Sequence, residues 1–345
     1  MPSNQLPPST RNSASYGFAT ILSTGAFVPE TKMTNQDIIE QYNLMATDRA
    51  VQHITGAKER RWVKQGIYSS DLLAQAAQQC LTRANVSVDQ LDRIIYARLL
   101  GDGLIPATSA RLLEKLQATV SIPAFDITAA CSGFIHALDM GVRCIDSGED
   151  YVLVLAGGIF SKSINQANKQ NTRTVFLLGD GAAGVLLGTS SKRQFFASYI
   201  YTDSTMYELS YIPYGASMLA ENRHIDNDAF DMQMPDGKKI HQSTIHSARI
   251  VSEKLFAQTR FSPQNLDIFI TSDQTTQIWK DQLKYLNIPQ HKSLSLFSRY
   301  GNTVAAMPPL ILNEMLKEGK LKRGHLVLMM AHGAGASSGG LIFEY

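Results

Sequence analysis

The sequence predicts an α/β fold built from two similar halves. Eight apolar runs of strand length alternate with longer segments of helical period along the 345 residues. In each half a helical segment is followed by a polar turn, a Leu-Asp pair and a strand. With 44% hydrophobic residues, a chain of this length can bury a large core. We therefore expect largely buried sheets covered by helices, with one half ending near residue 190.

Each apolar run is a candidate strand, because such runs are short, rich in branched side chains and bounded by turn residues. The eight runs are Phe18–Val28, Arg93–Leu100, Tyr151–Gly157, Ala182–Leu187, Phe195–Tyr201, Leu266–Thr271, His325–Ala331 and Gly340–Tyr345. Residues 1–16 are rich in Ser, Asn and Pro and lack the cationic start and apolar stretch of a signal peptide. We expect a disordered tail over 1–16, an N-terminal half over 17–190 and a C-terminal half over 191–345.

Two segments have the apolar spacing of amphipathic helices. Ser70–Ala84 and Ser243–Thr259 each place apolar side chains on one face, and each precedes one of the repeated Leu-Asp strands. Further along each half, a strand leads into a Gly-containing turn and a helix, once around Cys131 and once around Asn302. If the halves pack about a pseudo-twofold axis, these two turns approach each other and their side chains share one site.

The composition excludes several classes of function. The formal net charge is +2 and 18% of residues are charged, which gives no basic excess for nucleic acid. No apolar run approaches the length of about 20 residues that spans a bilayer. The sequence has an odd number of cysteines, Cys80, Cys131 and Cys144, and none of them forms a C-x-x-C pair. We therefore expect a reducing, cytoplasmic location. Paired His and carboxylate residues at metal-ligand spacing are absent from the sequence, so we expect no metal.

Cys131 is the strongest candidate for a catalytic residue. It lies where a buried strand turns into a helix, and the N–H groups at a helix N-terminus favour a thiolate. Ala129, Ala130 and Gly133 leave room beside it. A buried structural cysteine is the alternative interpretation. We prefer that alternative for Cys80 and Cys144, which lie inside helical patterns.

The chain resembles the ketoacyl synthase III family of condensing enzymes in several blocks that follow the family's order. The strong blocks are Asp126–Phe134, Leu178–Val185 and Tyr300–Ala306, and weaker ones are Thr55–Arg61 and Ala331–Gly335. The resemblance implies a duplicated thiolase-like fold with five αβαβα layers, usually as a homodimer. It also implies an active site made of Cys, His and Asn, in which the Cys carries the acyl group. The co-substrate would be an acyl-coenzyme A or an acyl carrier protein thioester, and no cofactor would be bound permanently. Cys131 and Asn302 fall on two of the three site positions.

The third position departs from the family. The family pattern His-Gln-Ala-Asn is replaced by Asp273-Gln274-Thr275-Thr276. The family's His and Asn donate hydrogen bonds to the enolate formed on decarboxylation, whereas an ionised Asp accepts hydrogen bonds and would repel the enolate. Asp273 could instead act as a general base on an acceptor, or it could be a relic without a catalytic role.

His332 offers another source of an imidazole, because it stands in the Gly-rich block where the family more usually has an apolar aromatic residue. That block contributes backbone N–H groups to the oxyanion site, so we expect Gly333 and Gly335 near the oxyanion. A structural role for His332 is the alternative, and His136 is expected to pack on another face of its helix. At the expected substrate entrance, the family's basic and Trp residues are replaced by Ala50, Ile54 and Ile278.

The residues therefore predict an acyl-transferring enzyme of specialised lipid, polyketide or secondary metabolism that forms a thioester on Cys131. Three alternatives remain open. The enzyme could pass the acyl group to an oxygen, nitrogen or sulfur nucleophile without forming a carbon–carbon bond. It could decarboxylate a malonyl unit with His332 in place of the missing His. Finally, the chain could be a non-catalytic subunit that pairs with a related synthase.

Overall fold

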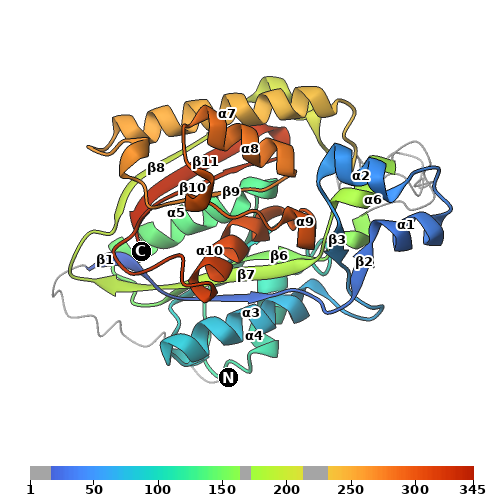
Figure 1. Cartoon of the computed structure of the whole chain (residues 1–345). Helices are drawn as coiled ribbons and strands as arrows, with labels where there is room; N and C mark the ends of the chain where they lie inside the picture. The colour runs from blue at the N-terminus through green and yellow to red at the C-terminus, as the bar shows by residue number, and fades with distance from the viewer. Residues whose placement is uncertain (1–16, 164–171, 213–231) are drawn as a thin grey trace.

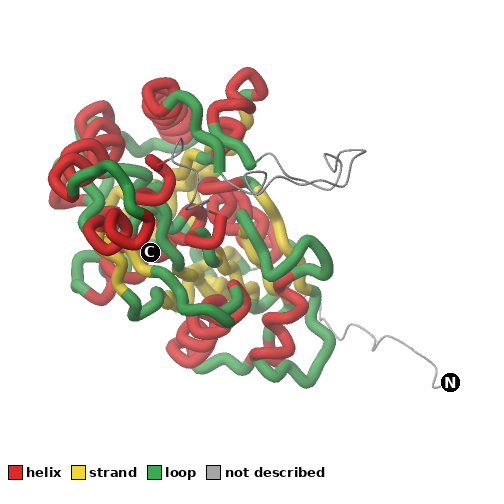
Figure 2. Tube along the Cα trace, turned by 90° about the vertical axis from the view of Figure 1, so that its right-hand side faces the viewer, coloured by secondary structure: helices red, strands yellow, loops and turns green. Residues whose placement is uncertain are grey.

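The computed structural model describes residues 17–163, 172–212 and 232–345. The expected disordered tail over residues 1–16 lies outside the described residues. Two large sheets dominate the described part, and Figure 2 shows strands in the interior with helices outside and between them. The strands are β1 Phe18–Phe27, β2 Lys32–Thr34, β3 Glu59–Arg61, β4 Arg93–Arg98, β5 Ala124–Thr128, β6 Val152–Gly158, β7 Gly181–Ser190, β8 Phe195–Thr202, β9 Ile268–Thr271, β10 Leu326–His332 and β11 Ser337–Glu344.

The two sheets repeat one topology. The first has the order β1-β7-β6-β4-β5 and the second the order β8-β11-β10-β9. In each sheet the first three strands pair antiparallel and the third and fourth pair parallel. The first sheet uses strands from residues 18–190 and the second uses strands from 195–344, so the proposed boundary near residue 190 falls between β7 and β8. Each of the eight apolar runs forms all or most of a strand.

Helices separate and cover the sheets. They are α1 Asn35–Tyr42, α2 Asp48–Thr55, α3 Ser69–Ala84, α4 Thr108–Lys115, α5 Gly133–Asp146, α6 Thr172–Leu177, α7 Gly237–Ala257, α8 Thr276–Tyr285, α9 Phe297–Tyr300 and α10 Met307–Lys317. Figure 1 shows α3 and α4 outside the first sheet, α5 and α10 between the sheets, and α7 and α8 outside the second sheet. Three apolar clusters fill the corresponding spaces. The expected five layers are therefore confirmed.

A repeated turn places the two candidate residues together. Cys131 lies in a 3-10 turn, Ala130–Ser132, that leads into α5, and the turn Val304–Ala306 leads into α10 in the same way. The first residue of each turn has a positive φ, 48° at Ala130 and 54° at Val304, which is costly for residues other than glycine. The two turns contact each other. The approach expected from the sequence repeat is therefore present.

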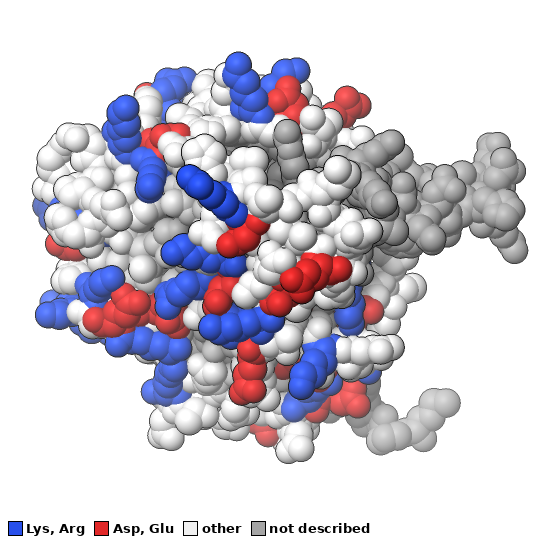
Figure 3. All heavy atoms as spheres, turned by 45° about the vertical axis from the view of Figure 1, so that its right-hand side comes forward, with Lys and Arg blue, Asp and Glu red and all other residues white. Residues whose placement is uncertain are grey.

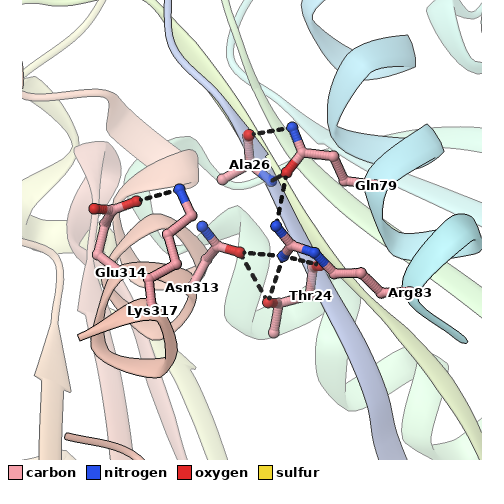
Figure 4. A network of polar contacts seen from close by, with 7 residues as sticks. All are labelled: Thr24, Ala26, Gln79, Arg83, Asn313, Glu314 and Lys317. Atoms are coloured by element: carbon pink, nitrogen blue, oxygen red, sulfur yellow. Dashed lines mark hydrogen bonds and ion pairs between the residues drawn. The ribbon is translucent and has the colours of Figure 1, made fainter. Parts of the chain in front are cut away.

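A buried polar network joins the two halves (Figure 4). The Asn313 side-chain oxygen on α10 accepts hydrogen bonds from Thr24 Oγ1 at 2.9 Å and from Arg83 Nη1 at 2.7 Å. Arg83 also donates to the Thr24 carbonyl at 2.7 Å, and Gln79 Nε2 donates to the Ala26 carbonyl at 2.9 Å. The network thus connects α10 of the C-terminal half to β1 and α3 of the N-terminal half.

We expect Asn313→Ala to lower the free energy of unfolding by about 2 kcal/mol, because Thr24 and Arg83 lose a buried acceptor. Urea denaturation measures this change. Lys317→Ala is the matched control on the same helix, since Lys317 makes only a surface ion pair with Glu314 at 2.8 Å and should change stability by less than about 0.5 kcal/mol. Equal effects of the two substitutions would contradict the role assigned to the network.

The surface offers little separation of charge on the face drawn in Figure 3, where positive and negative side chains are intermixed. Along the described ranges, no helix is long and apolar enough to cross a membrane.

Candidate active site

The nucleophile candidate lies at the end of a strained turn between β5 and α5. Cys131 is half-buried and follows Ala130, whose left-handed conformation directs the chain from the strand into the helix. Gly133 begins α5, and a Cβ at this position would lie 3.2 Å from the Cβ of Ala97. The lack of a side chain at Gly133 therefore lets the helix start close to β4 and brings Cys131 to the junction of the two halves.

Asn302 is held against this turn by its backbone and by its side chain. Its N–H donates to the Leu177 carbonyl at 2.6 Å, and its side-chain oxygen accepts from the Val304 N–H at 2.8 Å. The Asn302 side chain also hydrogen-bonds the Cys131 thiol. This bond lowers the pKa of the thiol, which a donor to the thiolate does, so we assign it to the amide nitrogen of Asn302.

The thiol of Cys131 is protonated in the unliganded site. Burial raises the pKa of the thiol to about 12, while hydrogen bonds from its own backbone N–H and from Asn302 oppose that rise. Burial of the thiol therefore opposes the thiolate that the sequence argument expected at this turn. A base must remove the proton as the sulfur attacks.

His332 provides an uncharged imidazole at the same cavity. It ends β10, is only 3% exposed, and neither ring nitrogen has a hydrogen-bond partner. Burial lowers the pKa of the imidazole to about 3, so the ring is neutral at physiological pH. Its backbone is fixed, because its N–H donates to Ser272 Oγ at 3.0 Å and its carbonyl accepts from Gln274 Nε2 at 2.6 Å. A neutral imidazole can accept a proton or donate one.

Asp273 is close in sequence to this site but its carboxylate is turned away from the cavity. It is fully buried, and Oδ2 accepts from the backbone N–H groups of Leu296 at 2.8 Å and Phe297 at 3.0 Å, where α9 begins. Oδ1 has no partner, and burial raises the pKa of the carboxyl to about 6. The structure therefore brings Cys131, Asn302 and His332 together at one cavity, and Asp273 does not line that cavity.

The glycine-rich loop after β10 packs directly on the nucleophile turn. The Gly333 N–H donates to the Ser337 carbonyl at 2.8 Å, so this N–H is already used within the loop. Gly335 has a φ of +69° and also lines the cavity. Of the two glycines expected near the oxyanion, Gly335 is therefore the candidate N–H donor. Gly333 is instead needed so that the loop can pack closely against the backbone of the nucleophile turn.

We expect Gly333→Ala to slow acylation of Cys131 by about 10- to 100-fold, because a Cβ there would lie 2.9 Å from the Cys131 nitrogen and 3.0 Å from the Ala129 carbonyl oxygen. Quenched-flow mass measurement of the acyl-enzyme gives this rate. Gly103→Ala is the control, since Gly103 is exposed, does not line the cavity, and its Cβ would meet nothing nearer than 3.7 Å. A smaller effect at Gly333 than at Gly103 would contradict the packing argument.

The described lining residues enclose a cavity of about 390 Å³ at Cys131. Asn302, His332, Gly333 and Gly335 line it, and Asp273 does not. Of the three residues placed at the substrate entrance from the sequence, Ile54, which is 71% exposed, and the buried Ile278 line it, whereas Ala50 is not among the lining residues. Lys238 in the first turn of α7 is a basic lining residue that the sequence argument missed. Among the residues described, no three His, Cys, Asp or Glu side chains are grouped to hold a metal.

A second hydrogen-bonded chain behind the nucleophile was also missed. Ser132 Oγ lies 3.0 Å from Ser337 Oγ, which lies 3.4 Å from His136 Nε2, and His136 Nδ1 lies 3.0 Å from the Ser132 carbonyl oxygen. A carbonyl only accepts, so Nδ1 carries the proton and Nε2 accepts from Ser337. His136 therefore connects the nucleophile turn to the glycine-rich loop, and no spacing in the sequence signals a contact over 201 positions.

Comparisons with known proteins agree with this geometry. The family described as 3-Oxoacyl-[acyl-carrier-protein (ACP)] synthase III matches residues 125–204, and its C-terminal counterpart matches residues 256–345. The beta-ketoacyl-[acyl-carrier-protein] synthase III of Aquifex aeolicus is 32% identical over 94% of this chain and 99% of its own. A crystal structure of the Aquifex aeolicus enzyme has a TM-score of 0.85, with 95% of this chain and 100% of that chain covered. The priming beta-ketosynthase of the R1128 polyketide pathway, 22% identical, has the same fold with a TM-score of 0.87 over 97% and 98% of the two chains.

The fold and the cysteine site are those of the thiolase-like class of condensing enzymes, transferases whose reaction generally passes through an acyl-cysteine. Within that class, the chain belongs to the beta-ketoacyl-[acyl-carrier-protein] synthase III family.

Proposed function

We propose that this protein takes an acyl group from acyl-coenzyme A or acyl carrier protein onto Cys131 and passes it to a second substrate. The observation that carries the proposal is the shared cavity. There the Cys131 thiol is hydrogen-bonded by Asn302, and the neutral imidazole of His332 makes no hydrogen bond. Lys238 at the same cavity suits a phosphate-bearing donor. A role in specialised lipid, polyketide or secondary metabolism fits the altered site.

His332 is the proton acceptor in the first step. The sulfur of Cys131 attacks the thioester carbonyl, the S–H proton passes to the imidazole, and a carbon–sulfur bond forms. The bond to the donor sulfur then breaks, and that sulfur takes the proton from the imidazolium. We assign this role to His332 and not to Asp273, because the Asp273 carboxylate is occupied by the N-terminus of α9 and does not line the cavity.

Backbone N–H groups and Asn302 stabilise the oxyanion of this step. The Cys131 N–H lies in the turn that begins α5, and Gly335 in the glycine-rich loop lines the same cavity. Preorganised donors of this kind are worth about 3 to 4 kcal/mol each in acyl transfer. The Asn302 amide nitrogen faces the sulfur and can donate in the second step.

The second step has two candidate chemistries. Transfer to an oxygen, nitrogen or sulfur nucleophile needs only a base, which His332 supplies. Decarboxylative condensation needs two donors toward an enolate, and Asn302 with the N–H of a neutral His332 could provide them. Release of carbon dioxide from a malonyl thioester distinguishes the two. We favour the first, because no histidine occupies the position of Asp273.

We also propose that two copies of the chain associate, in the cytoplasm. β5 stands at the edge of the first sheet, where a further strand can pair with it. The neighbouring loop exposes Leu104 by 62% and Ile105 by 88%, and Thr108 at its end donates from its backbone N–H to Asp126 on β5 at 2.8 Å. Light scattering of the purified protein gives the mass, and a related synthase as partner is the alternative.

The test of the function is intact-protein mass after mixing with a panel of acyl-coenzyme A and acyl-carrier thioesters, followed by fragment mapping. We expect one added acyl mass on the peptide that contains Cys131. If a folded protein takes no acyl group from any donor, or takes it at Cys80 or Cys144, the acyl-Cys131 proposal fails. The chain would then act as a supporting subunit of a related synthase.

A further inference from the structure

The cavity at Cys131 has one apolar side. Cys131 packs against a cluster that contains the buried Leu178, Met232 and Val304, with Leu99 and Met234 partly buried beside it. All five of these apolar residues also line the cavity. This side can accept an acyl chain without leaving a polar group unpaired.

The other side of the cavity is polar and belongs to the C-terminal half. Thr244 and Ser247 face the cavity from successive turns of α7, and His332 and Ser338 face it from β10 and β11. His332 and Ser338 stand directly opposite each other in the antiparallel pairing of these strands. The apolar side and the polar side of the cavity therefore suit different parts of the two substrates of a transfer reaction.

Two side chains on the polar side are buried and have hydrogen-bonding capacity to spare. His332 is 3% exposed and Ser338 is fully buried, and neither ring nitrogen of His332 nor the Ser338 hydroxyl makes a hydrogen bond of good geometry. The phenol of Tyr201 donates to Ser247 Oγ at 3.0 Å and has Ser338 as a second, looser partner. Buried polar groups are normally paired, because leaving them unpaired costs free energy. The ring nitrogens of His332 and the oxygen of Ser338 are thus open to hydrogen bonds from whatever fills the cavity.

The polar side is also fixed in place before a substrate binds. Gln274 Nε2 donates to the His332 carbonyl at 2.6 Å, and its Oε1 lies 3.3 Å from the Thr244 hydroxyl. Gln274 therefore links α7 to the end of β10. A subsite built on a helix and two paired strands keeps its donors and acceptors preorganised.

We propose that this polar side is the acceptor subsite and that it takes a hydroxylated acceptor, whose attacking hydroxyl is flanked by further hydroxyl groups. The inference rests on the proposed acyl-Cys131. The acceptor O–H gives its proton to the His332 ring, the oxygen forms a bond to the acyl carbon, and the carbon–sulfur bond breaks. The sulfur of Cys131 then takes the proton from the imidazolium. The neighbouring hydroxyls add hydrogen bonds to Ser338 and Ser247, which a plain alkyl acceptor cannot make.

The test starts from one preloaded acyl-enzyme and compares glycerol with propan-1-ol, which share a three-carbon chain and a primary hydroxyl. Loss of the acyl mass is followed with time. We expect glycerol to discharge the wild-type enzyme at least about tenfold faster than propan-1-ol, and Ser338→Ala to bring this ratio below about threefold. Ser247→Ala should act in the same direction. The ratio cancels effects on acylation, because both alcohols meet the same acyl-enzyme.

Ser252→Ala is the matched control, since Ser252 is buried on α7, donates to the Arg249 carbonyl at 3.0 Å and does not line the cavity. It should keep the wild-type ratio. Equal discharge by both alcohols, or a ratio that neither Ser338→Ala nor Ser247→Ala changes, would overturn the subsite.

A binding measurement keeps this test separate from the proposed function. Saturation-transfer NMR on Cys131→Ala protein, which cannot be acylated there, should detect contact with glycerol that the added Ser338→Ala change removes. If the wild-type enzyme takes no acyl group, the proposed function fails and this measurement alone decides the subsite. No contact with glycerol in the Cys131→Ala protein would count against it.

Discussion

His332→Phe is expected to slow acyl transfer through Cys131 by about 100- to 1,000-fold, because it removes the imidazole that exchanges protons with the thiol and the acceptor. Phenylalanine is close in size and leaves no polar group buried. The substitution should therefore keep or slightly raise stability, since both ring nitrogens of His332 are unpartnered in the wild type. A large loss of activity with an unchanged melting temperature is the signature of a catalytic role.

The control for His332 is His325→Phe, because His325 immediately precedes the same strand and its side chain accepts only from the nearby Lys322 N–H, at 3.4 Å. Single-turnover acylation and transfer should stay within about threefold of wild type.

The dependence of activity on pH tests whether His332 is uncharged. Burial lowers the pKa of its imidazole to about 3, so the neutral form persists on acidification from pH 8 to pH 6. A loss of activity near pH 6.5 that His332→Phe abolishes would contradict this assignment.

The architecture could be predicted from the sequence because local patterns encode it. The strands of the interior are continuous apolar runs, such as β10, in which all seven residues are buried. The repeated strand-turn-helix blocks around Cys131 and Asn302 indicated that the two turns would meet, and positive φ values at Ala130 and Val304 show the same turn twice. These features depend on neighbours in sequence, which is why they could be read without coordinates.

The orientation of individual site residues could not be predicted, because it depends on contacts between distant segments. The motif placed Asp273 at the position of the family's histidine, but the N–H groups at the start of α9 hold its carboxylate. The turn around Cys131 suggested a thiolate, whereas burial among residues from both halves raises the pKa of the thiol. The link between Gln274 and His332 likewise joins segments 58 positions apart.

Asp273 is expected to limit stability at neutral pH. Burial raises the pKa of its carboxyl to about 6 in the folded protein, against about 3.9 in an unfolded chain. Between these values the folded state binds more protons than the unfolded state, so stability falls as pH rises through about 4 to 6. Above pH 6 the accumulated cost of ionising Asp273 is about 3 kcal/mol, of which roughly half develops between pH 5 and pH 7.5.

Asp273→Asn should remove this cost, because the amide oxygen can still accept from Leu296 and Phe297 without a buried charge. Urea denaturation at pH 5 and pH 7.5 should show a smaller loss of stability with pH in the variant than in the wild type. Asp273→Ala, which removes the acceptor as well as the charge, should be less stable than Asp273→Asn by about 3 kcal/mol, because the N–H groups of Leu296 and Phe297 are left unpaired. The rate of acyl transfer also distinguishes His332 from Asp273 as the general base. If Asp273 only holds α9, Asp273→Asn should keep activity within about tenfold of wild type. A loss of about 100-fold or more in a folded variant would instead assign the role of general base to Asp273.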